Sequence, residues 1–481
     1  MNWTIFQNLR FVFSIAAVLV MISIEDCLAE GDFELISEIR MPSLMKSAQD
    51  LSSLSEKVSP GSSGMVAMSV AALSFSPQMA PFDLTLPIQV LGFSSKKGNS
   101  KSFEWCLVLE RKKDIPLNNS LKDMKEPVYL KEIGGKGLLT YSKSLSESIT
   151  SIPKSEEDAI ESDPNIILIL YPEKYFSSFP EGLETFKNEM IRQIIQKKGR
   201  EEEDFNEITF LNLKLGAFEN FLRQCGKFEM DISFCEESIK INTEFSTSKG
   251  SPTEKFLDSQ TFKGKYKKDI LDSNEFVSCG HISITDDLKS SIVNMTKEAM
   301  VETSDEANPD ITDLFSILTD KFSGNFKFFM KSFAPGSPVC LEIQATDEKQ
   351  KELRTFISGR KNIEDAGNGI FRFKKGNKES KFNFFLVMQK NKIKVVYGKI
   401  ASTYDEKLIS TESPAAGAAP ANDADIYVDA YSSAVKELPM FSSKLTFAEK
   451  SLIINTEIFM EGIKRTIPPE LMKNQQNLNQ E

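Results

Sequence analysis

The sequence predicts an α+β protein made of two tandem, diverged halves, each an antiparallel sheet with helices on one face. Motifs recur in the same order along the chain, several segments alternate apolar and polar residues, and separate stretches carry helical spacing. Runs of strands accompanied by helices on one side are typical of the α+β class. With 481 residues, the chain is long enough for two or three domains.

The first 29 residues predict a signal peptide. Arg10 precedes an apolar run from Phe11 to Ile24, and Cys27-Leu28-Ala29 supplies the small residues of a cleavage site. The run is shorter than the roughly 20 residues of a membrane span; an uncleaved anchor is the alternative. We therefore expect an exported protein, periplasmic or secreted, with no transmembrane span in the mature chain.

The repeat is clearest where FCEESIKINTEF, from Phe234 to Phe245, returns 213 positions later as FAEKSLIINTEI, from Phe447 to Ile458. Three further pairs are WCLVL (105–109) with VCLEI (339–343), GLLTYSK (137–143) with KVVYGKI (394–400), and NIILILYP (165–172) with DIYVDAY (425–431). Because the order is kept and the spacing is not, we predict halves at 31–262 and 263–468 with different insertions.

Strands are predicted by residue alternation and helices by wider spacing. From Phe228 to Phe234 and from Ile239 to Phe245, apolar residues occupy every second position, as on a sheet with one covered face. Gly134-Gly135 between two apolar runs predicts a hairpin turn with positive φ. Expected helices begin after Ser43 and at Asp286, with further candidates at 182–196 and 311–322. We expect a solvated charge run at 197–207, a linker at 412–423 and a disordered tail at 469–481.

Composition narrows the partners. The formal charge of −11 becomes −10 once Arg10, Glu25 and Asp26 are removed, which argues against nucleic acid as a partner. Thirty-six Phe against two Trp and nine Tyr indicate core filling. A Phe-rich pocket for an apolar ligand is the alternative.

Five cysteines remain after the signal segment: Cys106, Cys225, Cys235, Cys279 and Cys340. An odd number leaves at least one thiol unpaired or linked to another chain, and a bridge between Cys225 and Cys235 is one candidate. Cys106 and Cys340 lie in apolar runs, where we expect buried thiols.

Catalytic and cofactor motifs are sparse. The single histidine, His281, is either a general base or an ordinary strand residue, exposed or with its polar atoms satisfied, and the second reading is favoured. One histidine excludes multi-histidine metal centres, and the chain has no phosphate-binding glycine loop. Residues 60–64 lack the G-x-S-x-G of a nucleophile elbow. We expect no catalytic residue, metal or cofactor.

Four repeated polar residues have no role in the core: Asn242, Glu244, Asn455 and Glu457. If a pseudo-two-fold axis brought the outward faces of both halves together, these four side chains would line one surface. Carboxyl groups within about 10 Å of each other would then permit glycosidic chemistry. Ordinary solvent-facing strand residues are the alternative.

Two passages resemble known sequences. The first is Arg40-Met41-Pro42-Ser43, the short helix to Val58-Ser59-Pro60-Gly61, and Asp83-Leu84-Thr85-Leu86-Pro87 before IQVLGF; the second runs from Phe228 to Leu257. Both resemble uncharacterised exported proteins of planctomycete- and verrucomicrobia-type bacteria. Those proteins have no assigned activity, so the resemblance implies export and two halves and transfers no catalytic residue.

The expected function is that of an exported, non-enzymatic binding or scaffold protein of the cell envelope. The alternatives are a carrier of an apolar ligand and a carboxylate-dependent hydrolase. The sequence leaves the ligand or partner, the oligomeric state and the pairing of the thiols open.

Overall fold

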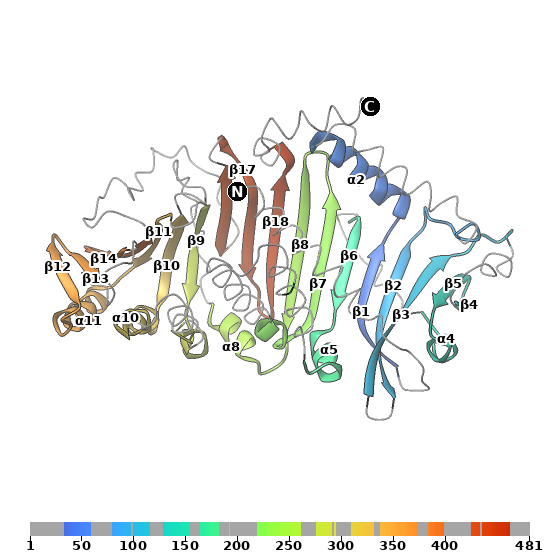
Figure 1. Ribbon diagram of the computed structural model, residues 1–481, viewed down its shortest axis with the longest axis horizontal. Helices are drawn as coiled ribbons and strands as arrows, with labels where there is room; N and C mark the ends of the chain where they lie inside the picture. The colour runs from blue at the N-terminus through green and yellow to red at the C-terminus, as the bar shows by residue number, and fades with distance from the viewer. Residues whose placement is uncertain are drawn as a thin grey trace. The chain divides into compact units, whose positions relative to one another are not determined.

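The computed structural model, whose helices and strands are drawn in Figure 1, divides into two compact units of mixed helix and antiparallel strand. The described residues are 33–58, 79–97, 100–115, 128–152, 164–181, 192, 219–260, 276–290, 293–294, 309–330, 337–373, 383–398, 425–432 and 435–461. The N-terminal unit holds the described residues of Asn2–Phe186, Phe221–Ser248 and Asn455–Glu481, and the C-terminal unit those of Lys187–Asn220 and Lys249–Ile454. The predicted signal peptide, the 182–196 helix except residue 192, and the regions at 197–207, 412–423 and 469–481 lie outside the described residues.

In the N-terminal unit, β1 (Phe33–Met41) lies between two antiparallel neighbours, β2 and β6. The pairing order is β4, β5, β3, β2, β1, β6, β7 and β8. The other strands of the unit are β2 (Ile88–Lys97), β3 (Ser100–Glu110), β4 (Tyr129–Ile133), β5 (Lys136–Thr140), β6 (Ile166–Leu170), β7 (Cys225–Phe234) and β8 (Ser238–Thr247). The predicted turn between β4 and β5 is confirmed, since Gly134 and Gly135 have φ values of 62° and 86°.

In the C-terminal unit, β9 (Phe276–Ser283) lies between β10 and β16, and all pairings described there are antiparallel. The pairing order is β12, β13, β14, β15, β11, β10, β9, β16 and β17. These strands are β10 (Ser323–Met330), β11 (Val339–Gln344), β12 (Ile363–Gly367), β13 (Ile370–Phe373), β14 (Asn383–Gln389), β15 (Lys392–Gly398), β16 (Ile426–Ser432) and β17 (Val435–Phe447). The last strand, β18 (Ser451–Phe459), pairs with β8, and its residues from Asn455 belong to the N-terminal unit.

The alternation predicted for β7 and β8 is confirmed. Ile239, Ile241 and Phe245 of β8 are buried, whereas Lys240 and Glu244 are exposed. The apolar side packs against Leu54 of α2 (Leu44–Val58), which is the predicted helix after Ser43. Burying an aliphatic side chain of this size contributes about 1.5–3 kcal/mol.

Helices on a single face were expected in each half, and for the N-terminal unit this is wrong. Leu145 of α4 (Lys143–Ser148) packs on the side of β3 that carries Cys106 and Val108. The register places Val108 in one row with Gln89 and Arg40, on the opposite side from Met41, Ile88 and the α2 core. The reason is composition. The side of the sheet that carries Arg40 is apolar at β3, so a second helix packs there. The N-terminal unit also contains α5 (Pro172–Ser178). Helix α8 (Pro252–Ser259) belongs to the C-terminal unit.

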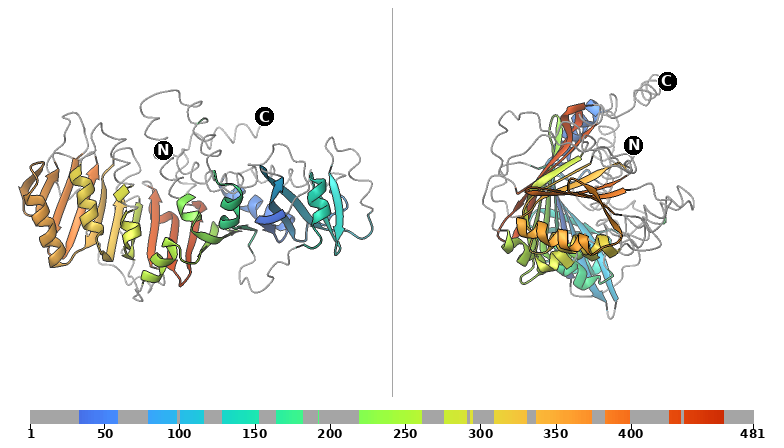
Figure 2. Two further views of the ribbon diagram at one scale, coloured as in Figure 1. Left: turned by 90° about the horizontal axis from the view of Figure 1, so that it is seen from below. Right: turned by 90° about the vertical axis from the view of Figure 1, so that its left-hand side faces the viewer.

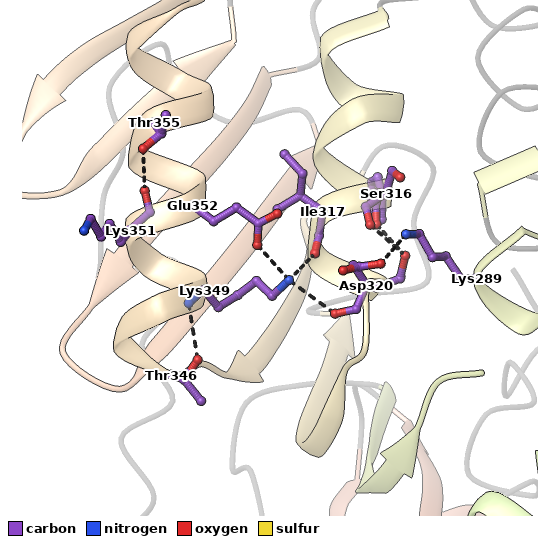
Figure 3. A network of polar contacts seen from close by, with 11 residues as sticks. Lys289, Ser316, Ile317, Asp320, Thr346, Lys349, Lys351, Glu352 and Thr355 are labelled. Carbon is purple, nitrogen blue, oxygen red and sulfur yellow. Dashed lines mark hydrogen bonds and ion pairs between the residues drawn. The ribbon is translucent and has the colours of Figure 1, made fainter. Parts of the chain in front are cut away.

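In the C-terminal unit, α10 (Pro309–Thr319), predicted at 311–322, packs with α11 (Asp347–Ser358) on one face of the sheet (Figure 2). Lys349 of α11 donates to the carbonyl oxygens of Ile317 (3.0 Å), in the last turn of α10, and of Asp320 (3.2 Å), just beyond it (Figure 3). Beyond the other end of α11, Arg360 pairs with Asp310 at 3.1 Å. A cation beside the final carbonyls and carboxylates in the first turn both suit the helix dipole.

Candidate functional site

One face of the N-terminal unit carries charged side chains on β1, β7 and β8, whereas its β2 and β3 end packs beneath α4. The register sets Arg40, Ile167, Asp231 and Asn242 side by side on β1, β6, β7 and β8. The neighbouring row is Glu38, Ile169, Glu229 and Glu244. Because residues two apart on a strand point the same way, both rows share a face. We call this surface the acidic face.

The β1 end of the acidic face is balanced. Glu38 is only 1% exposed, and Arg40 donates to both of its carboxylate oxygens, from Nη2 at 2.9 Å and from Nε. Gln89 Nε2 adds a third donor at 3.3 Å. The hydrogen bond to Glu38 raises the pKa of Arg40, which strengthens the hold of the guanidinium on this carboxyl.

The β7 and β8 end is not balanced. Glu229 and Glu244 are directly opposite each other, and like charges in that position repel. Burial, with added repulsion from Glu229 and Glu244, raises the pKa of Asp231 to about 6. Lys227, 2.6 Å from Glu229, is the cation that opposes this shift. Asp231 Oδ1 has no hydrogen-bond partner among the described residues.

The structure separates the four repeated polar residues of the sequence analysis. Asn242 and Glu244 lie on the acidic face, whereas Glu457 Oε1 accepts a hydrogen bond from Ser238 Oγ at 2.7 Å. Ser238 begins β8, six residues before Glu244, so about 20 Å of strand separates Glu244 from Glu457. Asn455, two residues before Glu457, is exposed. Glu244 and Glu457 are therefore too far apart for paired glycosidic catalysis.

His281 lies at one end of the C-terminal unit's sheet in a polar row. Its Nδ1 is 3.1 Å from Asn325 Oδ1, and its backbone N–H donates to the Asp425 carbonyl. Burial raises the pKa of Asp425, against the lowering effects of the Phe447 N–H and of His281. The predicted reading of His281 as a strand residue with a satisfied ring nitrogen agrees with these contacts.

None of the three described cysteines with a shifted pKa is a reactive thiolate. Burial raises the pKa of the Cys106, Cys225 and Cys340 thiols to about 12. The candidate bridge between Cys225 and Cys235 is wrong, because β7 separates them by roughly 30 Å and a disulfide needs Cα atoms within about 7 Å. Groups of three or more potential metal ligands are absent from the described part of the chain.

One polar contact, between a side chain before a strand and a backbone N–H, occurs in both units. Asn165, just before β6, accepts the Phe234 N–H on Oδ1 at 2.6 Å, and Asp425, just before β16, accepts the Phe447 N–H on Oδ2 at 2.7 Å. Their backbone N–H groups donate to Ile232 (2.8 Å) and Leu445 (2.9 Å). In each unit, one side chain fastens the turn end of a strand to its neighbour. We call this contact the hairpin clamp.

The fold and these contacts define an α+β protein with an acidic sheet face. Comparisons of the chain with protein-family models, curated proteins and solved structures found no match. Among the described residues, no helix has the length and apolar character needed to cross a bilayer.

Glu229 and Asp231 are the site residues that the motif search missed. Both stand at the polar positions of the β7 alternation, which placed them on the same face as Asn242 and Glu244 only once the hairpin register was fixed. The signal available in the sequence was the alternation of both strands, because their polar positions fall on one side when the strands pair as a hairpin. The internal repeat did not single out Glu229 and Asp231, because the second copy has Ser442 and Lys444 at the equivalent positions.

Proposed function

We propose that the protein is an exported, non-enzymatic binding protein that holds a cationic group of an envelope partner on the acidic face. The observation that carries the proposal is the opposed pair Glu229 and Glu244 beside Asp231. Three carboxyl groups with one lysine among them repel each other, and a positive group placed between them relieves that repulsion. Arg40 is bonded to Glu38 and acts on Glu229 only through space, so it meets this need in part.

We further propose that the two predicted halves, 31–262 and 263–468, derive from two diverged copies of one ancestral segment. The pairing rows support this independently of the motifs. From Cys106 the row passes through Leu91, Glu38, Ile169 and Glu229, and from Cys340 it passes through Phe329, Val277, Asp429 and Ser442. Ile169 to Asp429 is 260 positions and Glu229 to Ser442 is 213, the same spacings as their sequence motifs. The hairpin clamp recurs at these spacings as well.

One sequence pairing fails this test by a single residue. Cys106 pairs with Thr140 and Cys340 with Val396, which is 256 positions, whereas the motif GLLTYSK against KVVYGKI gives 257. A slip of one residue in a strand exchanges its two faces. The register therefore supports the equivalence of β5 and β15 with a corrected alignment.

The binding proposal is tested by titrating the full chain with a tetralysine peptide and with its fully acetylated form, using calorimetry at low salt. Only the charged peptide should bind, and added salt should weaken it. Asp231→Asn combined with Glu244→Gln should weaken binding about tenfold. The matched control, Glu236→Gln combined with Glu237→Gln, removes two acids from the hairpin turn beyond the acidic face.

Equal weakening by both double variants would mean that net charge, not the acidic face, attracts the peptide. Equal binding of the acetylated peptide would remove the electrostatic basis. Export is tested separately by mass spectrometry of the protein made in its own cells, where cleavage after Ala29 predicts Glu30 at the amino terminus.

A carboxylate-dependent hydrolase is the second candidate, favoured by the Asp231 pKa of about 6 beside the carboxyl groups of Glu229 and Glu244. That pattern supplies a proton donor and a base on one surface. The test is release of reducing sugar from envelope polysaccharide. Release by the wild type that is lost in the single variant Asp231→Asn would favour the hydrolase over the binding protein.

A further inference from the structure

Three glutamates among the described residues are at least nine-tenths buried: Glu38, Glu104 and Glu342, exposed by 1%, 3% and 5%. A carboxyl group that deep stays ionised only with a compensating positive charge or a full set of donors, and is otherwise protonated. Glu38 has Arg40, and Glu342 has Lys392 at 2.6 Å and Lys394 at 3.6 Å.

Glu104 is the exception. Its Oε1 accepts one hydrogen bond, from Ser95 Oγ at 3.1 Å, and its Oε2 has no hydrogen-bond partner in the described part of the chain. No ion pair joins Glu104 to a described lysine or arginine. Ser95 Oγ is also 2.7 Å from Ser102 Oγ, so one carboxylate and two hydroxyls form a compact group of oxygens.

The surroundings of this group are apolar. The register places Glu104 beside Phe93, which pairs in turn with Leu35, and places Ser95 beside Phe33. Phe33, Leu35 and Phe93 belong to the hydrophobic cluster beneath α4. In this apolar, low-dielectric setting, a positive charge beside Glu104 would be attracted more strongly than at the surface.

We infer that Glu104, Ser95 and Ser102 form a binding site for one small monovalent cation, either an ammonium group or an alkali ion. The carboxylate balances the single charge, and the hydroxyl oxygens complete its coordination. The site is separate from the acidic face: Glu104 lies on β3, and Glu229, Asp231 and Glu244 lie on β7 and β8.

Urea unfolding of the full chain, followed by Trp105 fluorescence, tests the site. A ligand that binds only the folded state raises the unfolding midpoint with its concentration. Tetramethylammonium chloride, too large for a buried site, fixes the effect of ionic strength. Against it, ammonium or methylammonium chloride should raise the midpoint if an ammonium group is the occupant, and sodium or potassium chloride if an alkali ion is.

Glu104→Gln should abolish this specific rise. Glu110→Gln, on the same strand but paired with Lys136 at the surface, should retain it. If Glu104→Gln does not fold, Ser102→Ala removes one coordinating oxygen and should reduce the rise. No rise above tetramethylammonium in the wild type, or an undiminished rise in the variants, overturns the inference.

Discussion

Replacement of Asn165 by alanine removes the hairpin clamp of the N-terminal unit. The Phe234 N–H, buried and bonded to Asn165 Oδ1 at 2.6 Å, is left without its acceptor. The same change breaks the bond from Asn165 Nδ2 to Asp50 of α2, at 2.7 Å. A buried N–H without a partner costs about 1–3 kcal/mol, and a bond to a carboxylate that regains water adds about 1 kcal/mol. We expect Asn165→Ala to lower the free energy of unfolding by about 2–4 kcal/mol.

The assay is urea unfolding followed by tryptophan fluorescence. Of the two tryptophans, Trp3 lies in the predicted signal peptide, and Trp105 of β3 is the one in the described part of the N-terminal unit, on which it reports. With a slope of roughly 2 kcal/mol per molar, the midpoint should fall by about 1–2 M.

The matched control is Asn242→Ala, the same chemical change on β8 in the same unit. Its side chain makes no hydrogen bond in the described part of the chain, so its effect should stay within about 0.5 kcal/mol. A midpoint for Asn165→Ala no lower than that of the control would refute the role of the clamp.

Three further outcomes are expected. Asp425→Asn keeps an acceptor for the Phe447 N–H and removes a carboxyl whose pKa is raised by burial, so thermal stability at neutral pH should rise and its decline with increasing pH should flatten. Because the folded-state pKa of Asp231 is about 6 against an ordinary 3.8, its contribution to stability is present below that ordinary value and is lost as the pH rises through 6; carbon NMR of the carboxyl and pH-dependent melting of Asp231→Asn check this. Leu353→Ala empties a fully buried position of α11 and should cost about 2–5 kcal/mol by calorimetric unfolding.

Sequence patterns predicted those elements whose periodicity is regular. The alternation of β7 and β8, α2 after Ser43, and α10 were predicted, because each has an unbroken apolar stripe. The segment of α11 was not singled out, since its apolar positions Leu353 and Ile357 stand among charged residues. The β12 and β13 hairpin was missed because β12 (IEDAG) is exposed and has no apolar face.

The acidic face needed information that one sequence does not contain. Which strands are neighbours depends on pairings across long stretches of chain, such as β1 with β6 and β6 with β7. Glu38 and Glu229 are 191 positions apart, and only the register places them in one row. The repeated I-N-T-E marked a hairpin held by a clamp, and its conspicuous glutamates proved to be separated.

The hairpin clamp joins its two strands across very different lengths of chain. Asn165 and Phe234 are 69 positions apart, whereas Asp425 and Phe447 are 22 apart, with the same bond between them. The hairpin clamp therefore forms across a long connection as well as a short one, since closure entropy grows only slowly with loop length. A longer connection between β6 and β7 would therefore cost little free energy, and Asn165 would still fasten the same pair of strands.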